Sequence, residues 1–355
     1  MPPRRRKRLD PALFDLPVEK IKQGCFTDRY FQRTREILKS DERDPVVVLQ
    51  VSAKSAGYLS GIDESVALLK LCSDDWSALT VHALYEGDRV EAWDTVMTIE
   101  GPYARFAHLE TLYLGTLARR TRICTNTRLA VEAARPKPVL FFGARHDHWS
   151  PQAGDGFAAF VGGAQAVSTE TQGSLFGARG VGIVPHALIS AYGGDAVVAT
   201  KKFADHVQPD VQVIADVDYH NDCVGTTIAV ARALEGRLWG VRLDTSENLV
   251  DKSIVPAMGT FKPTGVNPQL VWNVRNALDA EGLGEVKVVV GGGFDAARIR
   301  AFEEEKAPVD FYAVGAAIMN DGRFDFTGDI VTVDGKAESK VGRELRPNPK
   351  LEKVK

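Results

Sequence analysis

From about residue 138 onward, short apolar runs alternate strictly with amphipathic stretches. The apolar runs predict buried strands, and the amphipathic stretches between them predict helices. The predicted strands span 138–145, 163–169, 180–186, 211–218, 237–244, 286–293 and 310–315. Parallel strands joined by right-handed crossovers form a barrel or a doubly wound sheet. Because no GxGxxG motif follows the first strand, we favour an incomplete parallel α/β barrel of about seven strands.

Helix-start signals support this alternation. Asn267 is a predicted N-cap, Pro268 follows it at the first helical position, and Gly282 marks the end. One apolar face lies between these points, formed by Leu270, Val271, Val274 and Leu278. Asp222 is a second predicted N-cap, for a helix that begins near Cys223.

The first third of the chain has a mixed pattern. It predicts helices over 26–38, 61–72 and 104–133, a strand over 46–53, and β-structure over 77–100. Asp63 is the expected N-cap of the second helix. We therefore expect an α/β domain over 1–134 and the barrel over 135–320. The segment 321–355 contains short β segments that should pack back on the first domain, before a frayed end.

Composition excludes several classes of protein. Of the 355 residues, 44% are hydrophobic and 26% are charged, and the net charge of −3 implies no bulk attraction to nucleic acid or membrane. No apolar run approaches the ~20 residues that span a bilayer. The basic segment 4–8 has no apolar run beside it, so we expect a solvated tail and not a signal peptide. Four scattered cysteines without a CxxC pair suit a reducing, cytoplasmic location.

Two predicted strands run into glycine turns. They are VKVVVGGGFD (286–295) and DFYAVGAAI (310–318). Glycine lets backbone N–H groups approach a ligand closely, and paired turns after the last two strands of an α/β barrel are a common phosphate site. The pair predicts a protein that holds a phosphorylated small molecule.

Polar side chains gather at the ends of the predicted strands, which converge on one mouth of a barrel. They are Arg145, His146, His148, Gln165, Ser168, His186, Asp218, Arg242 and Asp244. Each also has a structural interpretation: the arginines as ion-pair partners, His186 as a capped buried histidine, and Asp244 as a helix cap. A metal pair at His146 and His148 is disfavoured, because no third ligand lies nearby in the sequence.

Six of these segments, in this order and spacing, resemble the nicotinate phosphoribosyltransferase family, and its short archaeal-type branch in particular. They are FGARHDH (142–148), GIVPHALI (182–189), VDYHND (217–222), GVRLDTSE (240–247), VVVGGGFD (288–295) and YAVGAAI (312–318). The N-terminal TDRYF (27–31) and the C-terminal VTVDGKAESKVGR (331–343) also fit the family. The resemblance thus covers nearly the whole chain.

The resemblance implies a type II phosphoribosyltransferase, with an N-terminal α/β sandwich domain and an incomplete barrel. Its reaction joins nicotinate to phosphoribosyl pyrophosphate and yields nicotinate mononucleotide and pyrophosphate, for NAD biosynthesis or salvage. It also implies a homodimer or higher homo-oligomer with the active site at the subunit interface. The alternatives are another pyridine base, quinolinate or nicotinamide, and a catalytically silent homologue that binds sugar phosphates.

Site residues follow from the matching motifs. The resemblance implies catalytic roles for His186, Asp218 and Asp244. It implies base binding by Tyr30 of the neighbouring subunit and by Phe142, Arg145 and Gln165. It implies phosphate or ribose binding by Arg242, Gly292, Gly293, Gly315 and Ala316.

The chemistry gives these residues a physical reason. Carboxylates aimed at C1 of the ribose stabilise its oxocarbenium-like transition state. Mg²⁺ is expected with the pyrophosphate, in contact with Asp218, and Asp216 is the alternative to Asp218 as the ribose or metal carboxylate. The histidine that matches His186 is phosphorylated by ATP in many members, so ATP is a candidate co-substrate.

Three departures from the family pattern bear on these expectations. Gln165 stands where the family has Asp in a GG-x-D segment, and Ile183 stands where it has Thr before the histidine. The C-terminus lacks the cysteines of many archaeal-type relatives, so we predict no structural zinc. Two other enzyme classes fit less well. A type I phosphoribosyltransferase would need adjacent acids where Asp216 and Asp218 are separated, and a Schiff-base aldolase would need a lysine better placed than Lys287.

Overall fold

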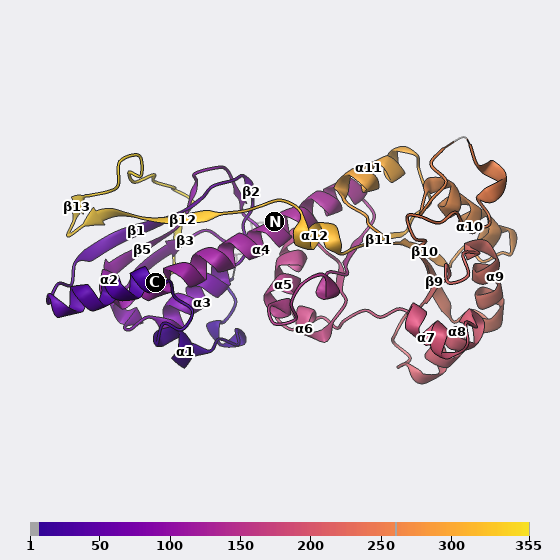
Figure 1. Cartoon of the computed structure of the whole chain (residues 1–355), viewed down its shortest axis with the longest axis horizontal. Helices are drawn as coiled ribbons and strands as arrows, with labels where there is room; N and C mark the ends of the chain where they lie inside the picture. Colours follow the sequence, from indigo (N-terminus) through magenta and orange to yellow (C-terminus); the bar gives the residue numbers. More distant parts are fainter. Residues whose placement is uncertain (1–6, 260, 355) are drawn as a thin grey trace. The chain divides into compact units, whose positions relative to one another are not determined.

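The computed structural model describes residues 7–259 and 261–354, which form two compact units (Figure 1). The first unit contains residues 1–125 and 321–355, and the second contains residues 126–320. Helix α4 (Glu110–Ala134) carries the chain from the first unit into the second. The domain boundary expected after residue 134 lies at the end of this helix, whereas the contacts divide after residue 125.

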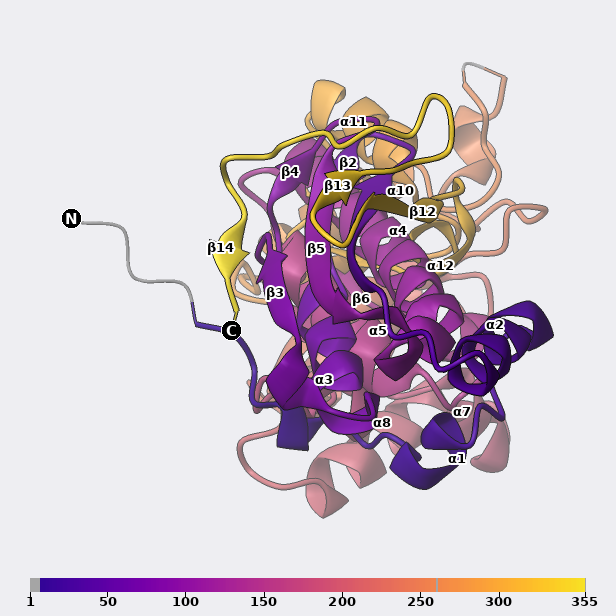
Figure 2. The ribbon, with the colours of Figure 1, turned by 90° about the vertical axis from the view of Figure 1, so that its left-hand side faces the viewer.

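The first unit is an antiparallel sheet with helices packed on it. The strand order is β13-β12-β1-β5-β3-β14, and β14 forms an edge beside β3 (Figure 2). The strands are β1 (Val46–Ala53), β2 (Gly57–Tyr58), β3 (Thr80–Ala83), β4 (Arg89–Val90), β5 (Thr95–Pro102), β12 (Phe326–Val333), β13 (Lys336–Ala337) and β14 (Glu352–Lys353). The helices, besides α4, are α1 (Val18–Lys22), α2 (Arg29–Ser40) and α3 (Ile62–Cys72). Alternate residues of β1, β3 and β5 pack with α3 and α4 in one apolar core, which confirms the predicted sandwich.

Both ends of the chain take part in this unit more than the sequence indicated. Residues 1–6 lie outside the described residues, but Arg8 is not a solvated tail residue. Its guanidinium forms an ion pair of 2.9 Å with Asp63 and donates to the carbonyls of Ala83 and Leu84. Asp63 is therefore not an N-cap, and α3 begins after Gly61, which has φ +86°. The C-terminal end is also not frayed, since β14 pairs with β3.

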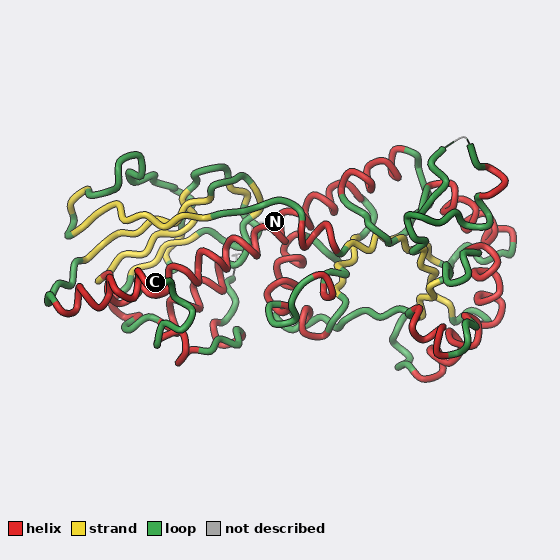
Figure 3. The backbone as a smooth tube through the Cα atoms, viewed as in Figure 1, coloured by secondary structure: helices red, strands yellow, loops and turns green. Residues whose placement is uncertain are grey.

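The second unit is a parallel sheet of six strands surrounded by helices, in the order β7-β6-β11-β10-β9-β8. The strands are β6 (Val139–Phe141), β7 (Ala166–Val167), β8 (Val213–Asp216), β9 (Leu238–Leu243), β10 (Lys287–Val290) and β11 (Phe311–Val314). The helices are α5 (Gln152–Gly162), α6 (Glu170–Gly173), α7 (His186–Ala191), α8 (Ala196–His206), α9 (Cys223–Leu234), α10 (Pro268–Ala280), α11 (Ala296–Glu304) and α12 (Ala316–Asn320). Figure 3 shows the strands as an arc with a loop on the remaining side. The predicted fold class, an incomplete parallel barrel, is confirmed.

The strand predicted over 180–186 does not form. In its place, two isolated parallel bridges join Gly180 to Val167 and Val184 to Ala215, so this segment spans from β7 to β8. Glycine costs backbone entropy and Pro185 has no N–H to donate, and both weaken a strand. The barrel is closed on this side by single bridges and not by a ladder.

The helix starts predicted in the second unit are confirmed. Asn267 accepts a hydrogen bond from the backbone N–H of Leu270, and α10 begins at Pro268. The predicted apolar face of α10 is buried. Asp222 caps α9 by accepting from the N–H of Gly225. Within the described residues, no helix is both long and apolar enough to cross a membrane.

Candidate active site

Strand register brings one layer of residues to the carboxyl edge of the barrel. Asp216 pairs with Arg242, Val290 pairs with both Leu243 and Tyr312, and Val314 pairs with Phe141. Side chains two residues apart in a strand share a face. Arg242 also pairs with Val289, which belongs to an apolar cluster inside the barrel together with Leu140, Ile214 and Ala313; Phe142 and Ile183 pack against this cluster. Asp216 and Arg242 therefore lie beside an apolar cluster.

The centre of this layer is a buried arginine between two carboxylates. Arg242 donates from Nη1 to Oδ1 of Asp216 at 2.9 Å, and its Nη2 lies 2.9 Å from Oδ2 of Asp244. Arg242 is only 8% exposed and Asp216 only 2%. Gly291 makes room for this arrangement, because a Cβ there would come within 2.7 Å of Nη2 of Arg242. Arg242 thus acts as a clamp that holds two carboxylates side by side.

Burial and charge change the pKa values of this group. Burial raises the pKa of Asp216 to about 6, although Arg242 opposes the shift. Burial alone would lower the pKa of Arg242, but Asp216 and Asp244 outweigh it and raise the pKa. The guanidinium therefore stays charged. Its role as a phosphate ligand stays a prediction, since carboxylates occupy both terminal nitrogens in this structure.

His186 contacts a third carboxylate of the cluster, that of Asp218. It is the first residue of α7, and its Nε2 lies 2.8 Å from Oδ1 of Asp218 and 3.8 Å from Oδ2 of Asp216. The hydrogen bond with Asp218, helped by the charges of Asp216, Asp218 and Asp244, raises the pKa of His186 against the effect of burial. Three carboxylates face one arginine and one histidine, so the cluster carries a net negative charge. Such a cluster can stabilise a developing positive charge.

The first glycine turn lies beside this cluster. Gly292 and Gly293 have φ of +81° and +75°, which an L side chain adopts only with strain, and a Cβ on Gly292 would lie 3.1 Å from Oδ1 of Asp244. At the other turn, a Cβ on Gly315 would lie 2.5 Å from the carbonyl oxygen of Phe142. Both turns therefore need glycine. Ala316 begins α12 directly after the second turn.

Other predicted site residues lie outside this carboxylate cluster. Phe142 points into the barrel cluster, and Arg145 is exposed in the short turn that follows it, with no ion pair in the described part of the chain. The predicted placement of Gln165 at the carboxyl end of a strand is wrong. It precedes β7, and its backbone N–H bonds to the carbonyl of Val139 at the start of β6, so it lies at the amino edge of the sheet, opposite the carboxylate cluster. The two-residue strand begins later than its apolar pattern indicated, and Gln165 cannot represent a carboxyl strand end.

Tyr30 belongs to the first unit. It lies in the first turn of α2, is 60% exposed, and donates a hydrogen bond of 3.3 Å to Asp28. Its contact with a neighbouring subunit stays a prediction.

Two residues lie near the glycine turns without having been assigned a role there from the sequence: His146, which was noted only among the strand ends, and Arg298, which was missed. His146 lies against the second turn, because a Cβ on Gly315 would come within 2.7 Å of its Nε2. Burial, helped by the charge of Arg145, lowers the pKa of His146. Arg298 donates from Nη1 to the carbonyl of Gly292 at 2.5 Å. The only signal for Arg298 was its place in the first turn of the helix after the GGG segment.

Across residues 7–259 and 261–354, no three His, Cys, Asp or Glu side chains come together as a set that could hold a metal ion by themselves.

Comparison with known proteins identifies the family. The chain is 34% identical to the solved structure of nicotinate-nucleotide pyrophosphorylase from Pyrococcus furiosus, with a TM-score of 0.79 over 94% of this chain and 82% of that chain. The chain belongs to the type II phosphoribosyltransferase family. Residues 28–121 match the family described as quinolinate phosphoribosyl transferase, N-terminal domain.

More distant members of the family agree in fold. Nicotinate phosphoribosyltransferase of Bacillus subtilis is 26% identical over 241 residues, which are 67% of this chain and 45% of that protein. The structure of human nicotinic acid phosphoribosyltransferase is 16% identical, with a TM-score of 0.66 over 88% of this chain and 76% of that chain, and it supports the fold alone. The chain spans about half the length of the first curated relatives it matches.

Proposed function

We propose that this type II phosphoribosyltransferase joins a pyridine base to phosphoribosyl pyrophosphate, with nicotinate as the base, and releases nicotinate mononucleotide and pyrophosphate for NAD synthesis. The observation that carries the proposal is the cluster of Asp216, Asp218 and Asp244 around Arg242 and His186, directly beside the first glycine turn and at the same edge of the sheet as the second. It provides negative charge for a sugar cation and backbone N–H groups for a phosphate at one edge of the barrel.

The transfer would proceed as follows. The glycine turns at 292–293 and 315 hold the 5′-phosphate through backbone N–H groups. As the bond between C1 and pyrophosphate lengthens, Asp218 and Asp244 face the positive charge that develops on the ribose. Arg242 keeps Asp244 oriented and prevents Asp216 and Asp244 from repelling each other. The ring nitrogen of the base then attacks C1.

Magnesium fits the cluster as a partner of the substrate. Asp218 and Asp244 are only partly buried and carry the negative charge that a divalent cation needs. When bound, Mg²⁺ would neutralise the charge of the departing pyrophosphate. Asp218 is the carboxylate we assign to this contact, and Asp216, which is buried against Arg242, is the weaker candidate.

ATP coupling is a second part of the proposal. His186 is 41% exposed in its side chain, and its Nε2 is engaged by Asp218. Its Nδ1 has no hydrogen-bond partner among the described residues and is the nitrogen free to accept the γ-phosphoryl group of ATP, with ADP as the leaving product. The contact with Asp218 favours a proton on Nε2, which leaves the lone pair on Nδ1 for this attack.

Base recognition rests on Arg145. It is exposed at the mouth and has no carboxylate partner among the described residues, so it can pair with the single carboxylate of nicotinate. Quinolinate is the second candidate, because residues 28–121 match the quinolinate family description. Its extra carboxylate would need a further cation, and its conversion would release CO₂ where nicotinate releases none.

One assay tests the enzyme and its base together. The protein is mixed with phosphoribosyl pyrophosphate, Mg²⁺ and nicotinate, nicotinamide or quinolinate, with and without ATP, and pyrophosphate, CO₂ and ADP are measured. Of the three bases, we expect only nicotinate to give pyrophosphate release, and we expect ATP to stimulate that release. Tight binding of phosphoribosyl pyrophosphate without release from any base would instead identify a catalytically silent homologue.

A matched pair of variants tests the carboxylate assignment. Asp218→Ala should lower turnover by at least ~10²-fold, as removal of an electrostatic stabiliser does. Asp222→Asn, in the same loop, keeps a good N-cap residue and should leave turnover unchanged. Near-normal turnover of Asp218→Ala would transfer the role to Asp216.

A complementation test addresses the subunit interface. Tyr30 is exposed on α2, and we propose that it reaches the base site of a second subunit. Mixed dimers of a Tyr30→Ala chain and an Asp218→Ala chain should then recover activity that neither variant has alone. If the mixed dimers recover no activity, Tyr30 lies outside the site.

A further inference from the structure

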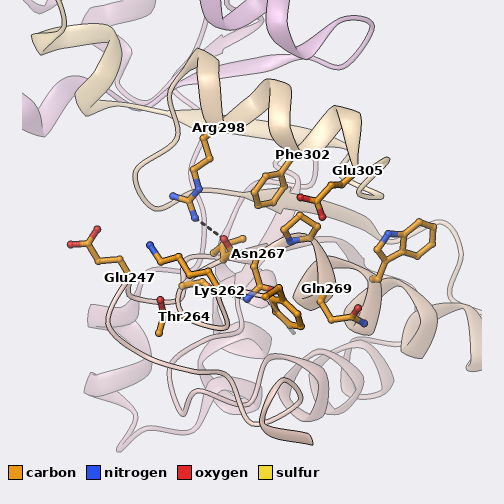
Figure 4. Close-up of a pocket in the computed structure, with 13 residues that line it drawn as sticks. Glu247, Lys262, Thr264, Asn267, Gln269, Arg298, Phe302 and Glu305 are labelled. Carbon is orange, nitrogen blue, oxygen red and sulfur yellow. Dashed lines mark hydrogen bonds between the residues drawn. The ribbon is translucent and has the colours of Figure 1, made fainter. Parts of the chain in front are cut away.

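A pocket lies next to the first glycine turn. It has a volume of about 460 Å³, within the range of small-molecule sites, and is formed by the loop between β9 and α10 together with α10 and α11 (Figure 4). None of the carboxylate cluster lines it. Its wall contains Arg298, which also contacts Gly292 of the turn.

One side of the pocket carries an arginine that has no ion pair. Arg298 donates to two backbone carbonyls, those of Gly292 at 2.5 Å and Val266 at 2.6 Å, and stacks on the ring of Phe294. It forms no ion pair in the part of the chain that the structure describes, and burial lowers its pKa against the opposing charges of Asp295 and Glu247. A half-buried guanidinium that no carboxylate contacts directly favours an anionic ligand.

Two neighbouring side chains add hydrogen-bond donors on this side of the pocket. Lys262 and Thr264 lie on the side of the pocket where Figure 4 also shows Arg298 and Glu247. Lys262 is exposed and forms no ion pair within 7–259 and 261–354. An ammonium, a guanidinium and a hydroxyl are the donors that a phosphate group uses.

Aromatic side chains also line the pocket, namely Phe261, Trp272 and Phe302. Phe302 lies near Arg298, whose Cζ is 5.8 Å from the centroid of its ring, and Trp272 is 39% exposed although it is a large apolar side chain. Figure 4 shows Gln269 and Glu305 on the side of the pocket away from Glu247 and Lys262. Aromatic walls suit a planar ring, and the carboxylate of Glu305 suits an N–H donor on that ring while it repels a second carboxylate.

We propose that this pocket binds a mononucleotide whose base carries an exocyclic amino group. The phosphate lies against Arg298 and Lys262, and the base lies among the aromatic side chains with its amino group toward Glu305. Because Arg298 holds the carbonyl of Gly292, occupation of the pocket also changes the affinity of the glycine turn for phosphoribosyl pyrophosphate; this second effect rests on the proposed function.

Direct binding tests the site without any catalytic readout. AMP is titrated by calorimetry and by tryptophan fluorescence, where a signal lost in Trp272→Phe identifies the pocket. Arg298→Met should weaken AMP binding by about tenfold or more, as loss of a charged hydrogen bond does. Arg300→Met removes an exposed arginine from the same helix and should leave binding within about twofold. IMP, which carries an oxygen in place of the amino group, should bind about tenfold more weakly than AMP.

Further arms separate this site from the catalytic one. AMP should still bind to His186→Ala and in the presence of saturating phosphoribosyl pyrophosphate, with a shifted affinity. No AMP binding at millimolar concentration, equal loss in the Arg298→Met and Arg300→Met variants, or full displacement by phosphoribosyl pyrophosphate would each overturn the proposal. Absence of turnover with intact AMP binding would overturn the proposed function only.

Discussion

Replacement of Arg242 by methionine should destabilise the barrel in a strongly pH-dependent way. Methionine replaces the aliphatic stem of arginine but carries no charge, so the substitution removes both 2.9 Å ion pairs and leaves the stem able to pack. Asp216, which is 2% exposed, then remains buried without a partner. The perturbation isolates the electrostatic role of the clamp.

The magnitude follows from burial and distance. A charge pair at about 4 Å is worth about 4 kcal/mol at an effective dielectric constant of 20, and the desolvation of both groups offsets much of it. Removal of one partner of a buried pair typically costs about 3–5 kcal/mol, because the other charge is left uncompensated. We expect this range for Arg242→Met at pH 8, where Asp216 is ionised.

The pH dependence has a definite sign. The folded-state pKa of Asp216, about 6, lies above the unfolded value, so ionisation of this group lowers stability as pH rises through 6. Without Arg242, which lowers that pKa, the folded-state value rises further and the loss grows. At pH 5 Asp216 is largely protonated in both proteins, and the difference in unfolding free energy should be smaller.

Urea unfolding at pH 5 and pH 8 measures the effect. A loss of about 3 kcal/mol should lower the midpoint by about 1 M or more. Arg237→Met is the matched control, because it removes an exposed pair with Asp205 just before the same strand, and its effect should be small at both pH values. A loss of unfolding free energy below about 1 kcal/mol at pH 8, or an equal loss at pH 5, would contradict the stabilising role of Arg242 between the two carboxylates.

Three further predictions address other groups. Asp218→Asn should lower the pKa of His186, because its hydrogen bond is the largest cause of the raised value; NMR titration of the imidazole measures this, and an unchanged value would contradict the pairing. Gly315→Ala should raise KM for phosphoribosyl pyrophosphate by up to about 10²-fold, because its Cβ meets a rigid carbonyl oxygen, whereas Gly182→Ala meets nothing within 4 Å and should leave KM unchanged. Glu110→Gln should stabilise the protein more at pH 9 than at pH 6, because burial raises the pKa of Glu110 to about 8 and stability therefore falls as the pH rises from the unfolded value through 8; an equal effect at both pH values would count against this.

The sequence alone determined the fold class and, except over 180–186, the succession of strands and helices along the second unit. Continuous apolar runs at regular intervals leave few topologies for a parallel sheet, and the cap at Asn267 fixed the start of α10 within one residue. The glycine turns were also visible, since Gly292, Gly293 and Gly315 occupy positions where a side chain would clash or be strained. Local patterns of this kind depend on neighbours in the chain and can be read from it.

The tertiary structure decided which charged groups meet. The ion pairs of Arg242 depend on the register between β8 and β9, which brings Asp216 opposite it. Gln165 shows the converse, because a strand of two residues places it at the amino edge, a position that the apolar pattern could not give. Arg8 finds its partner Asp63 across 55 positions of sequence. Charges that lie far apart in the chain interact only after packing has set their distances, so their roles emerge from the folded molecule.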